Sequence, residues 1–273
     1  MMPRMSIATR LDAWLPTPLL KGSALLHLGA VASLARPQLW PWALGAVLAD
    51  HLLLTACGLW PRSRVLGPNW THLPAAAAAR GAIAITIDDG PDPEVTPRVL
   101  ALLAQSASSA TFFCIGERVA RYAELAREIV HQGHRIENHS QHHRHHFSVL
   151  GPRSLAREIA AAQETIERVT GTAPCFFRAP AGLRNPFLQP ILTRFDLKLA
   201  SWTRRGFDTV NADPAAVLGR LRRGLGAGDI LLLHDGHAAR TPSGAPVIVE
   251  VLPALLAACS AAGLKPMTLH SAL

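Results

Sequence analysis

The chain is short of cysteine and tyrosine, which argues against a small fold held together by disulfides or structural zinc. Four cysteines and one tyrosine occur among 273 residues. The cysteines lie inside apolar segments without CxxC spacing, so buried free thiols explain them better than disulfides or a zinc knuckle. The apolar fraction of 49% permits one large hydrophobic core instead.

Aromatic residues are also scarce, at 5% of the chain, and they are not interleaved with the basic residues. No helix-turn-helix or RNA-recognition signature is present, so we expect no nucleic-acid partner. The net charge of +8 suits a protein that works beside anionic lipid or on anionic glycans. The sequence shows no internal repeat and does not indicate the oligomeric state.

Charge is nearly absent from the first part of the chain, where only three charged residues occur between positions 15 and 60. Arg36 and its neighbours separate two apolar segments, 15–35 and 39–60. Each segment is long enough to cross a bilayer core of about 30 Å as a helix. We therefore expect a two-helix membrane hairpin. A simple signal peptide does not fit, because the apolar stretch is long and paired and no small-residue cleavage site follows it.

One residue in this region conflicts with a membrane span. Asp50 falls in the middle of the second segment, where a carboxylate costs roughly 2.5–3.5 kcal/mol on insertion scales. It would need a partner or a proton. A hairpin on the membrane surface and a soluble helical layer remain as alternatives. Tryptophans stand where membrane interfaces would lie: Trp14, Trp40, Trp42 and Trp60.

A pair of carboxylates follows the first strongly predicted strand. The run 82–87 is apolar and rich in isoleucine, which predicts a buried strand, and Gly90-Pro91 ends it. Asp88 and Asp89 would then lie at the carboxyl end of that strand, where α/β enzymes place their chemistry. Because side chains alternate along a strand, the two acids would face different ways if the strand includes both. A turn that favours Asp and Gly is the alternative.

Histidine is concentrated in one segment, since seven of the thirteen histidines fall between positions 131 and 146. His139 and His143 are four residues apart, so one helical turn would place both rings on the same face. Two imidazoles and one carboxylate form a zinc site that leaves a position for water, and Asp89 is the natural third ligand. The alternative is a solvated histidine-rich loop or an adventitious metal-binding tract.

Two further segments end apolar strands with charged side chains. Arg178 follows the strand at 175–177, and His234 follows the strand at 230–233. Charged groups at the ends of separate strands indicate one shared pocket. Helices are expected between the strands, at 93–105, 118–132, 152–170, 214–225 and 247–262, which favours a parallel sheet with right-handed crossovers.

Four motifs in order, TIDDGP, HSQHH, RAPAG and LLLHDG, resemble those of the polysaccharide deacetylase family, also called the NodB-homology domain or carbohydrate esterase family 4. The resemblance covers residues 82–268. It implies an α/β fold, a distorted (β/α) barrel expected to have seven strands. It also implies removal of acetyl groups from N-acetylated sugars with a divalent metal, most often Zn²⁺. We expect a membrane hairpin at 1–62, a linker at 63–80 and the deacetylase domain at 81–273.

The resemblance also implies a role for each motif residue. Asp88 would be the general base, Arg178 would hold and orient it, and His234 would be the general acid. The implied metal ligands are Asp89, His139 and His143. These residue types suit the chemistry, since a carboxylate can take a proton from water and an imidazole can protonate a departing amine.

Several positions depart from the family pattern. Ile87 replaces the usual Phe, Ser140 replaces the usual Thr, and Ala181 stands where an aromatic residue is common. A further motif of the family, an aspartate-rich stretch that comes between RAPAG and LLLHDG and usually ends in Trp, is poorly matched. The residues expected near the substrate are Pro180, Trp202 and Asp208, and Asp208 would support His234. The adjacent Arg204 and Arg205 indicate either an anionic group near the site or a solvated turn.

The hairpin bears on the choice of substrate, because it returns both of its ends to one side of a membrane. Arginines flank those ends: Arg4, Arg10, Arg62 and Arg64. The positive-inside rule then favours a cytoplasmic catalytic domain, although Arg36 in the turn opposes it. A cytoplasmic domain would favour a lipid-linked or soluble sugar over a cell-wall glycan.

The sequence therefore predicts a membrane-tethered, metal-dependent N-deacetylase acting on an amino-sugar-containing glycan or lipid-linked sugar. An esterase that removes O-acetyl groups with the same residues is one alternative. A catalytically inactive, glycan-binding relative is another, and the presence of all six motif residues argues against it.

Overall fold

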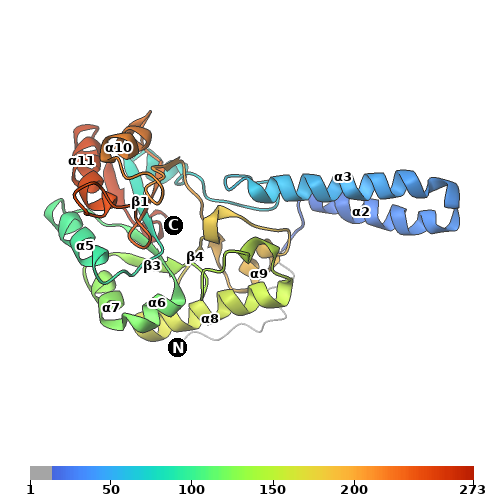
Figure 1. Cartoon of the computed structure of the whole chain (residues 1–273), viewed down its shortest axis with the longest axis horizontal. Coiled ribbons are helices and arrows are strands. Elements are labelled where there is room, and N and C mark those ends of the chain that lie inside the picture. Colours follow the sequence, from blue (N-terminus) through green and yellow to red (C-terminus); the bar gives the residue numbers. More distant parts are fainter. Residues whose placement is uncertain (1–13) are drawn as a thin grey trace.

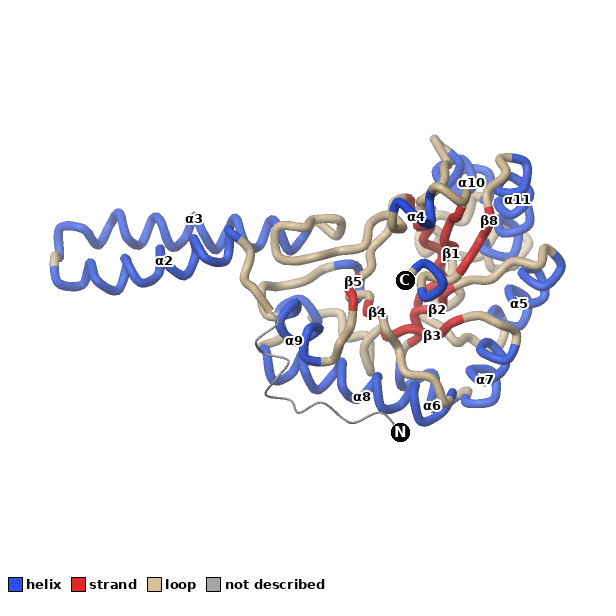
Figure 2. The backbone as a smooth tube through the Cα atoms, turned by 180° about the vertical axis from the view of Figure 1, so that it is seen from behind, coloured by secondary structure: helices blue, strands red, loops and turns tan. Residues whose placement is uncertain are grey.

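The protein consists of an α/β domain from which a long helical hairpin projects (Figures 1 and 2). The computed structural model describes residues 14–273, so Arg4 and Arg10, two of the arginines expected to flank the hairpin, lie outside the described residues. The α/β domain is built on a curled parallel sheet, and its helices lie on the outer side of that sheet.

The sheet runs in the order β5-β4-β3-β2-β1-β7-β6, and β8 pairs with the first half of β1. All pairs are parallel. The expected distorted (β/α) barrel is confirmed as a curled half-barrel, in which seven strands follow one another and β8 is an addition. The strands are β1 (Ala82–Asp88), β2 (Thr111–Cys114), β3 (Arg135–Asn138), β4 (Phe176–Phe177), β5 (Lys198–Leu199), β6 (Arg204–Arg205), β7 (Ile230–His234) and β8 (Lys265–Met267).

The helices alternate with the strands, as expected. The expected helix at 118–132 is instead two helices, because Tyr122 leaves the helical conformation with φ −118° and ψ 51°. The α-helices are α2 (Pro18–Ala32), α3 (Trp40–Leu59), α4 (Ala75–Ala78), α5 (Val95–Gln105), α6 (Gly116–Arg121), α7 (Ala123–His131), α8 (Pro152–Thr170), α9 (Leu188–Arg194), α10 (Pro214–Arg222) and α11 (Val247–Ala261). Short 3₁₀ helices are η1 (Ser33–Ala35), η2 (Pro37–Leu39), η3 (Phe147–Val149), η4 (Pro180–Gly182) and η5 (His270–Ala272).

The central strand β1 is buried along its whole length and separates two apolar clusters. Its isoleucines, Ile83, Ile85 and Ile87, pack outward against α5 and α11. The small residues Ala82 and Ala84 belong to the other cluster, which includes phenylalanines of β2 and β4. Because side chains alternate along a strand, bulky residues fill the helical layer and small ones fit the narrow inside of the half-barrel.

The hairpin consists of α2 and α3 lying side by side (Figures 1 and 2). By length and composition, both helical segments can cross a membrane. Asp50, the residue that conflicts with a span, is 8% exposed and accepts a hydrogen bond of 2.7 Å from Ser23 Oγ. The Nδ1 atom of His27 lies 3.9 Å from the same carboxylate. The hairpin thus supplies the polar partner that a central aspartate requires.

The segment 63–80, expected as a linker, runs against the open side of the half-barrel. Trp70 pairs with Ala200, and His72 pairs with Asp229. These contacts attach the segment to the end of β5 and the start of β7. Its buried apolar residues are Leu66, Leu73 and Ala77.

The end of α3 is in direct contact with the α/β domain. The backbone N–H of Arg184 donates to the carbonyl oxygen of Gly58 over 3.1 Å. A Cβ atom at Gly58 would collide with the carbonyl oxygen of Arg184. By contrast, nothing lies within 4 Å of a Cβ atom at Gly45 on the same helix. Glycine is therefore required at the junction but not in the middle of the hairpin.

We expect Gly58→Ala to destabilise the full chain in detergent by about 1–3 kcal/mol, because the added methyl group must displace backbone. Gly45→Ala on the same helix is the matched control and should be neutral or stabilising by up to about 1 kcal/mol. Thermal unfolding followed by circular dichroism measures both. Equal melting temperatures for the two variants would contradict the close contact between Gly58 and Arg184.

Candidate active site

The predicted catalytic residues come together at the carboxyl ends of neighbouring strands. Asp88 ends β1 and lies beside His234, which ends β7. His139 follows β3 and Arg178 follows β4, which are also neighbours in the sheet. Because the carboxyl ends of parallel strands meet at one edge, these side chains converge there. Asp88, His139 and His234 are among the residues that line a cavity of about 250 Å³.

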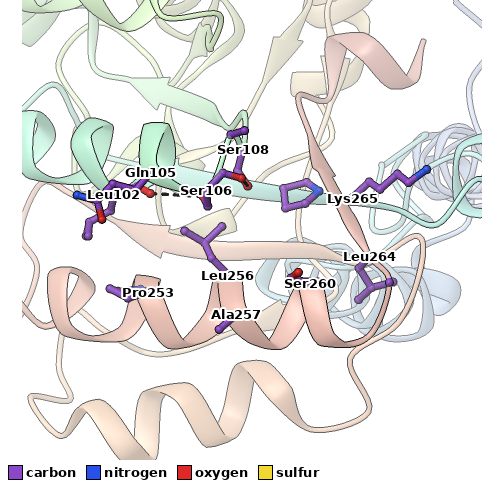
Figure 3. Close-up of a pocket in the computed structure, with 13 residues that line it drawn as sticks. Leu102, Gln105, Ser106, Ser108, Pro253, Leu256, Ala257, Ser260, Leu264 and Lys265 are labelled. Atoms are coloured by element: carbon purple, nitrogen blue, oxygen red, sulfur yellow. Dashed lines mark hydrogen bonds between the residues drawn. The ribbon is translucent and has the colours of Figure 1, made fainter.

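A larger hollow of about 650 Å³ lies elsewhere, between α5 and α11 near the amino ends of β2 and β8 (Figure 3). Its lining is made of apolar and small polar residues, and Lys265 is the one charged side chain in it. Carboxylates and imidazoles are absent from its lining. Size therefore does not identify the reactive site, whereas the gathering of titratable groups does.

Asp89, His139 and His143 are arranged as metal ligands. The Oδ1 atom of Asp89 lies 3.3 Å from His139 Nε2 and 3.3 Å from His143 Nε2. Zinc bonds of about 2.0–2.1 Å place two tetrahedral ligands roughly 3.3 Å apart, so these separations fit. The same Oδ1 atom is buried without a hydrogen-bond partner, which leaves an acceptor that a cation would satisfy. The residues present thus fit a divalent metal.

The protonation states of these residues also suit a metal site. Burial raises the pKa of Asp89, but the neighbouring imidazoles of His139, His237 and His143 together lower it well below its usual range. Burial, with a smaller effect of the neighbouring His139, lowers the pKa of His143 to about 4. His143 is then neutral at pH 7, as a metal-binding imidazole must be. The Nδ1–H group of His139 donates to the carbonyl oxygen of Arg178 over 2.8 Å, which fixes this ring.

The prediction that one helical turn joins His139 and His143 is wrong. β3 ends at Asn138, and the following loop contains left-handed residues at Ser140, with φ 65°, and His143, with φ 48°. Side chains replace helical hydrogen bonds here: the N–H of Ser140 donates to Asn138 Oδ1, and the N–H of His143 donates to Ser140 Oγ. This local turn brings the two ring centroids to 4.9 Å.

Asp88 and Asp89 were expected to face different ways if the strand included both, and the strand does not include both. β1 ends at Asp88, and Asp89 adopts a left-handed conformation with φ 72°. The alternation of the strand stops between them, so both carboxylates line the same cavity. Asp88 Oδ1 lies 2.6 Å from Arg178 Nη1, and its Oδ2 lies 3.9 Å from His139 Nε2.

Arg178 is 1% exposed, and all three nitrogen atoms of its guanidinium donate hydrogen bonds. Besides Asp88, it donates to Thr86 Oγ1 over 2.8 Å and to the carbonyl oxygens of Ala200 and Ser201 over 3.2 and 2.7 Å. These bonds fix the guanidinium and the carboxylate that it holds. The Asp88 carboxylate therefore has a fixed position and orientation in the cavity.

His234 is held by Asp208, which is fully buried. The ring Nδ1–H group donates to Asp208 Oδ1 over 2.9 Å, and the backbone N–H donates to Oδ2 over 2.7 Å. Burial lowers the pKa of His234, but the hydrogen bond and charge of Asp208, with the charges of Asp88 and Asp89, outweigh it and raise the pKa. His234 therefore keeps a proton more readily than a free imidazole, and Nε2 is left for proton transfer.

The remaining predicted residues divide into two groups. Trp202 lines the cavity, whereas Pro180 is buried and its neighbours Ala181 and Gly182 line it instead. Arg205, one of the two adjacent arginines singled out in the sequence, also lines the cavity. Three lining residues were not expected there from the sequence: His145, Thr209 and His237. The Nδ1 atom of His237 lies 3.4 Å from Asp89 Oδ2. Its position three residues after His234, past an Asp-Gly turn, was the available signal.

We expect the full chain in detergent to retain one zinc-like ion after loading and dialysis, and Asp89→Ala and His139→Ala to retain none, because each removes a ligand. His146→Ala, an exposed histidine of the same segment, is the control and should bind as the wild type does. Elemental analysis gives the stoichiometry. Equal metal loss in all three variants would indicate an adventitious histidine tract instead.

The sequence is similar to those of several known proteins. The polysaccharide deacetylase family model matches residues 75–200. The chain is 35% identical over 175 residues to a peptidoglycan-N-acetylglucosamine deacetylase of Bacillus cereus, an alignment that covers 63% of this chain and 81% of the relative. It is 33% identical over 174 residues to a chitooligosaccharide deacetylase of Sinorhizobium fredii, covering 60% and 76% of the two chains.

A solved structure is similar over much the same region. The family 4 carbohydrate esterase from Streptomyces lividans, determined in complex with acetate, superimposes with a TM-score of 0.61 and 30% sequence identity. The match covers 68% of this chain and 91% of the esterase. The family resemblance expected from the four motifs is thereby confirmed: the chain belongs to the polysaccharide deacetylase family.

Proposed function

We propose that the protein is a metal-dependent hydrolase that removes N-acetyl groups from an amino sugar, carried in a glycan or on a lipid. One observation supports the proposal: three groups of residues meet at one cavity. They are a carboxylate paired with an arginine, three potential metal ligands and a histidine paired with an aspartate. Membership of the family supports a carbohydrate deacetylase, and the relatives named above act on peptidoglycan N-acetylglucosamine and on chitooligosaccharides.

The first half of the reaction is attack of water on the acetyl carbonyl. A divalent cation held by Asp89, His139 and His143 would polarise that carbonyl and lower the pKa of a bound water to about 7. Asp88, held in place by its hydrogen bond from Arg178, accepts the proton that the water loses. General base catalysis of this kind contributes roughly 10²–10⁴-fold to the rate.

The second half is departure of the sugar amine. The C–N bond breaks, and His234 gives its proton to the leaving nitrogen, so that free amine and acetate result. Asp208 holds the imidazole by Nδ1 and stabilises its protonated form before the transfer. The acid and the base lie on adjacent strands with their residues paired in register, and both line the same cavity.

We also propose that the hairpin spans the membrane and that the catalytic domain lies on the cytoplasmic side. Trp40 and Trp60 mark the two ends of α3 and are both exposed, as expected of residues at membrane interfaces. Arg62 and Arg64 follow directly after the hairpin and favour the cytoplasmic side. A substrate on the cytoplasmic side would be a lipid-linked or soluble sugar.

We expect Asp88→Asn to lose roughly 10²–10⁴-fold in turnover while keeping its metal, because the amide cannot take the proton from water. Acetate release from N-acetylglucosamine oligomers by the full chain gives the rate, and elemental analysis gives the metal content. The same assay on an O-acetylated sugar distinguishes N-deacetylase from esterase activity. If Asp88→Asn lost its metal together with turnover, Asp88 would not be a base that acts apart from the metal ligands.

The pH dependence of turnover should depend on Asp208. His234 must be protonated to act as an acid, and its raised pKa keeps it protonated to higher pH than a free imidazole. Asp208→Asn removes the negative charge, so the pKa of His234 falls and the alkaline limb of the kcat profile moves to lower pH. A limb that stays in place in a variant with normal metal content would exclude His234 as the acid.

A further inference from the structure

A second cavity, of about 320 Å³, adjoins the catalytic cavity. Trp202 and Arg205 line both, so they form a shared wall. The other lining residues come from the end of the hairpin and from the segment around β6: Trp60, Pro61, Arg62, Thr203 and Phe207. The second cavity therefore lies between the catalytic residues and the hairpin.

The two arginines of β6 have different environments, although they are adjacent in sequence. Arg204 lies 2.6 Å from a carboxylate oxygen of Asp229 and also donates to the carbonyl oxygens of Arg223 and Gly224. Its charge is thus used within the fold. Arg205 has no ion pair with a carboxylate among residues 14–273, and its buried Nε atom has no acceptor there. The charge of Arg205 is free to bind a ligand.

Aromatic rings hold the Arg205 guanidinium in place. Its central carbon lies 4.8 Å from the centroid of the Phe207 ring and 5.5 Å from that of Trp202. Stacking of this kind fixes the plane of a guanidinium but neutralises none of its charge. The orientation of the guanidinium is therefore set before any ligand binds.

Arg62 brings a second positive charge to the same cavity. Its Nη1 atom donates to the carbonyl oxygen of Thr203 over 3.3 Å, and within the described part of the chain no carboxylate pairs with it. Two guanidinium groups with no acidic partner suit an anionic ligand. The planar fork of arginine matches the oxygens of phosphate.

The position of the cavity indicates where that phosphate comes from. Trp60, at the end of α3, is 61% exposed and lines the cavity. A tryptophan at the end of an apolar helix lies at the level of lipid headgroups, where lipid phosphates are found. The chain is packed tightly here, since a Cβ atom at Gly182 would meet both Pro61 and Trp202. The hairpin end and the catalytic cavity are therefore held at a fixed separation.

We propose that the second cavity is a phosphate subsite, and that the substrate is an N-acetyl amino sugar joined through phosphate to a membrane lipid. The proposal rests on the deacetylase function proposed above. The sugar occupies the catalytic cavity, and its phosphate lies between Arg205 and Arg62. The lipid chain continues past Trp60 along the hairpin. A carboxylate of a glycan would suit the arginines equally but would not explain the neighbouring membrane helices.

The test compares three substrates for the full, metal-loaded chain in lipid vesicles. They are the methyl glycoside of N-acetylglucosamine, N-acetylglucosamine 1-phosphate, and N-acetylglucosamine joined through phosphate to a long-chain lipid. We expect kcat/KM for acetate release to rise in that order. Arg205→Gln should lower the ratio of phosphorylated to unphosphorylated kcat/KM by about 10–100-fold, the effect of one charge-assisted hydrogen bond. Arg62→Gln should lower it in the same direction.

Two further variants serve as controls. Arg205→Lys keeps the positive charge but lacks the planar guanidinium. It should retain part of the preference for phosphorylated substrates, which separates phosphate binding from a folding defect. Arg98→Gln changes an exposed arginine on α5 that lines neither cavity, and it should alter no ratio. Melting temperatures confirm that each variant is folded.

The outcomes distinguish this proposal from the deacetylase function. Equal kcat/KM for all three substrates, unaffected by Arg205→Gln, would overturn the phosphate subsite while the deacetylase stands. Equal use of the soluble and the lipid-linked phosphate would overturn the lipid as its source. Calorimetric binding of N-acetylglucosamine 1-phosphate that requires Arg205, without acetate release from any substrate, would overturn the deacetylase function and support the subsite.

Discussion

The ion pair between Arg178 and Asp88 is the interaction on which the rest of the structure depends. A guanidinium that is 1% exposed is stable only where its donors are satisfied, and leaving one half of a buried ion pair without its partner costs about 3–5 kcal/mol. Arg178 satisfies its donors with Asp88 and Thr86 of β1 and with the carbonyl oxygens of Ala200 and Ser201. One side chain thus ties β1 to the segment after β5, across the inside of the half-barrel.

The same residue also connects the two parts of the proposed catalytic site. Its side chain holds Asp88, and its backbone carbonyl accepts the hydrogen bond that orients His139. The proposed base and a proposed metal ligand are therefore positioned by one residue. A change that moves Arg178 would disturb both, which explains why a buried charge is retained at the centre of the fold.

From Arg178 the hydrogen-bond network continues to the hairpin. Ser201, whose carbonyl oxygen accepts from Arg178, donates through its hydroxyl to the carbonyl oxygen of Pro61 over 2.6 Å. Asn69 donates to the same oxygen over 2.9 Å. The end of the apolar hairpin is thus two hydrogen bonds from Arg178. This connection gives the proposed phosphate subsite a defined position relative to Asp88.

The sequence by itself determined the strands that lead to Asp88, Arg178 and His234, most of the helices between strands and the apolar hairpin, because these follow from local hydrophobic periodicity and from breakers such as Gly90-Pro91. The short strand β3, which leads to the histidine motif, was not predicted. It also determined which residue types meet, since parallel strands deliver their carboxyl ends to one edge. Only the tertiary structure decided how they meet. The left-handed conformations of Asp89 and His143 depend on contacts of the folded loops, and periodicity does not contain them. Likewise, Asp229 neutralises Arg204 and leaves Arg205 free because β6 lies beside β7, a pairing between residues far apart in the chain.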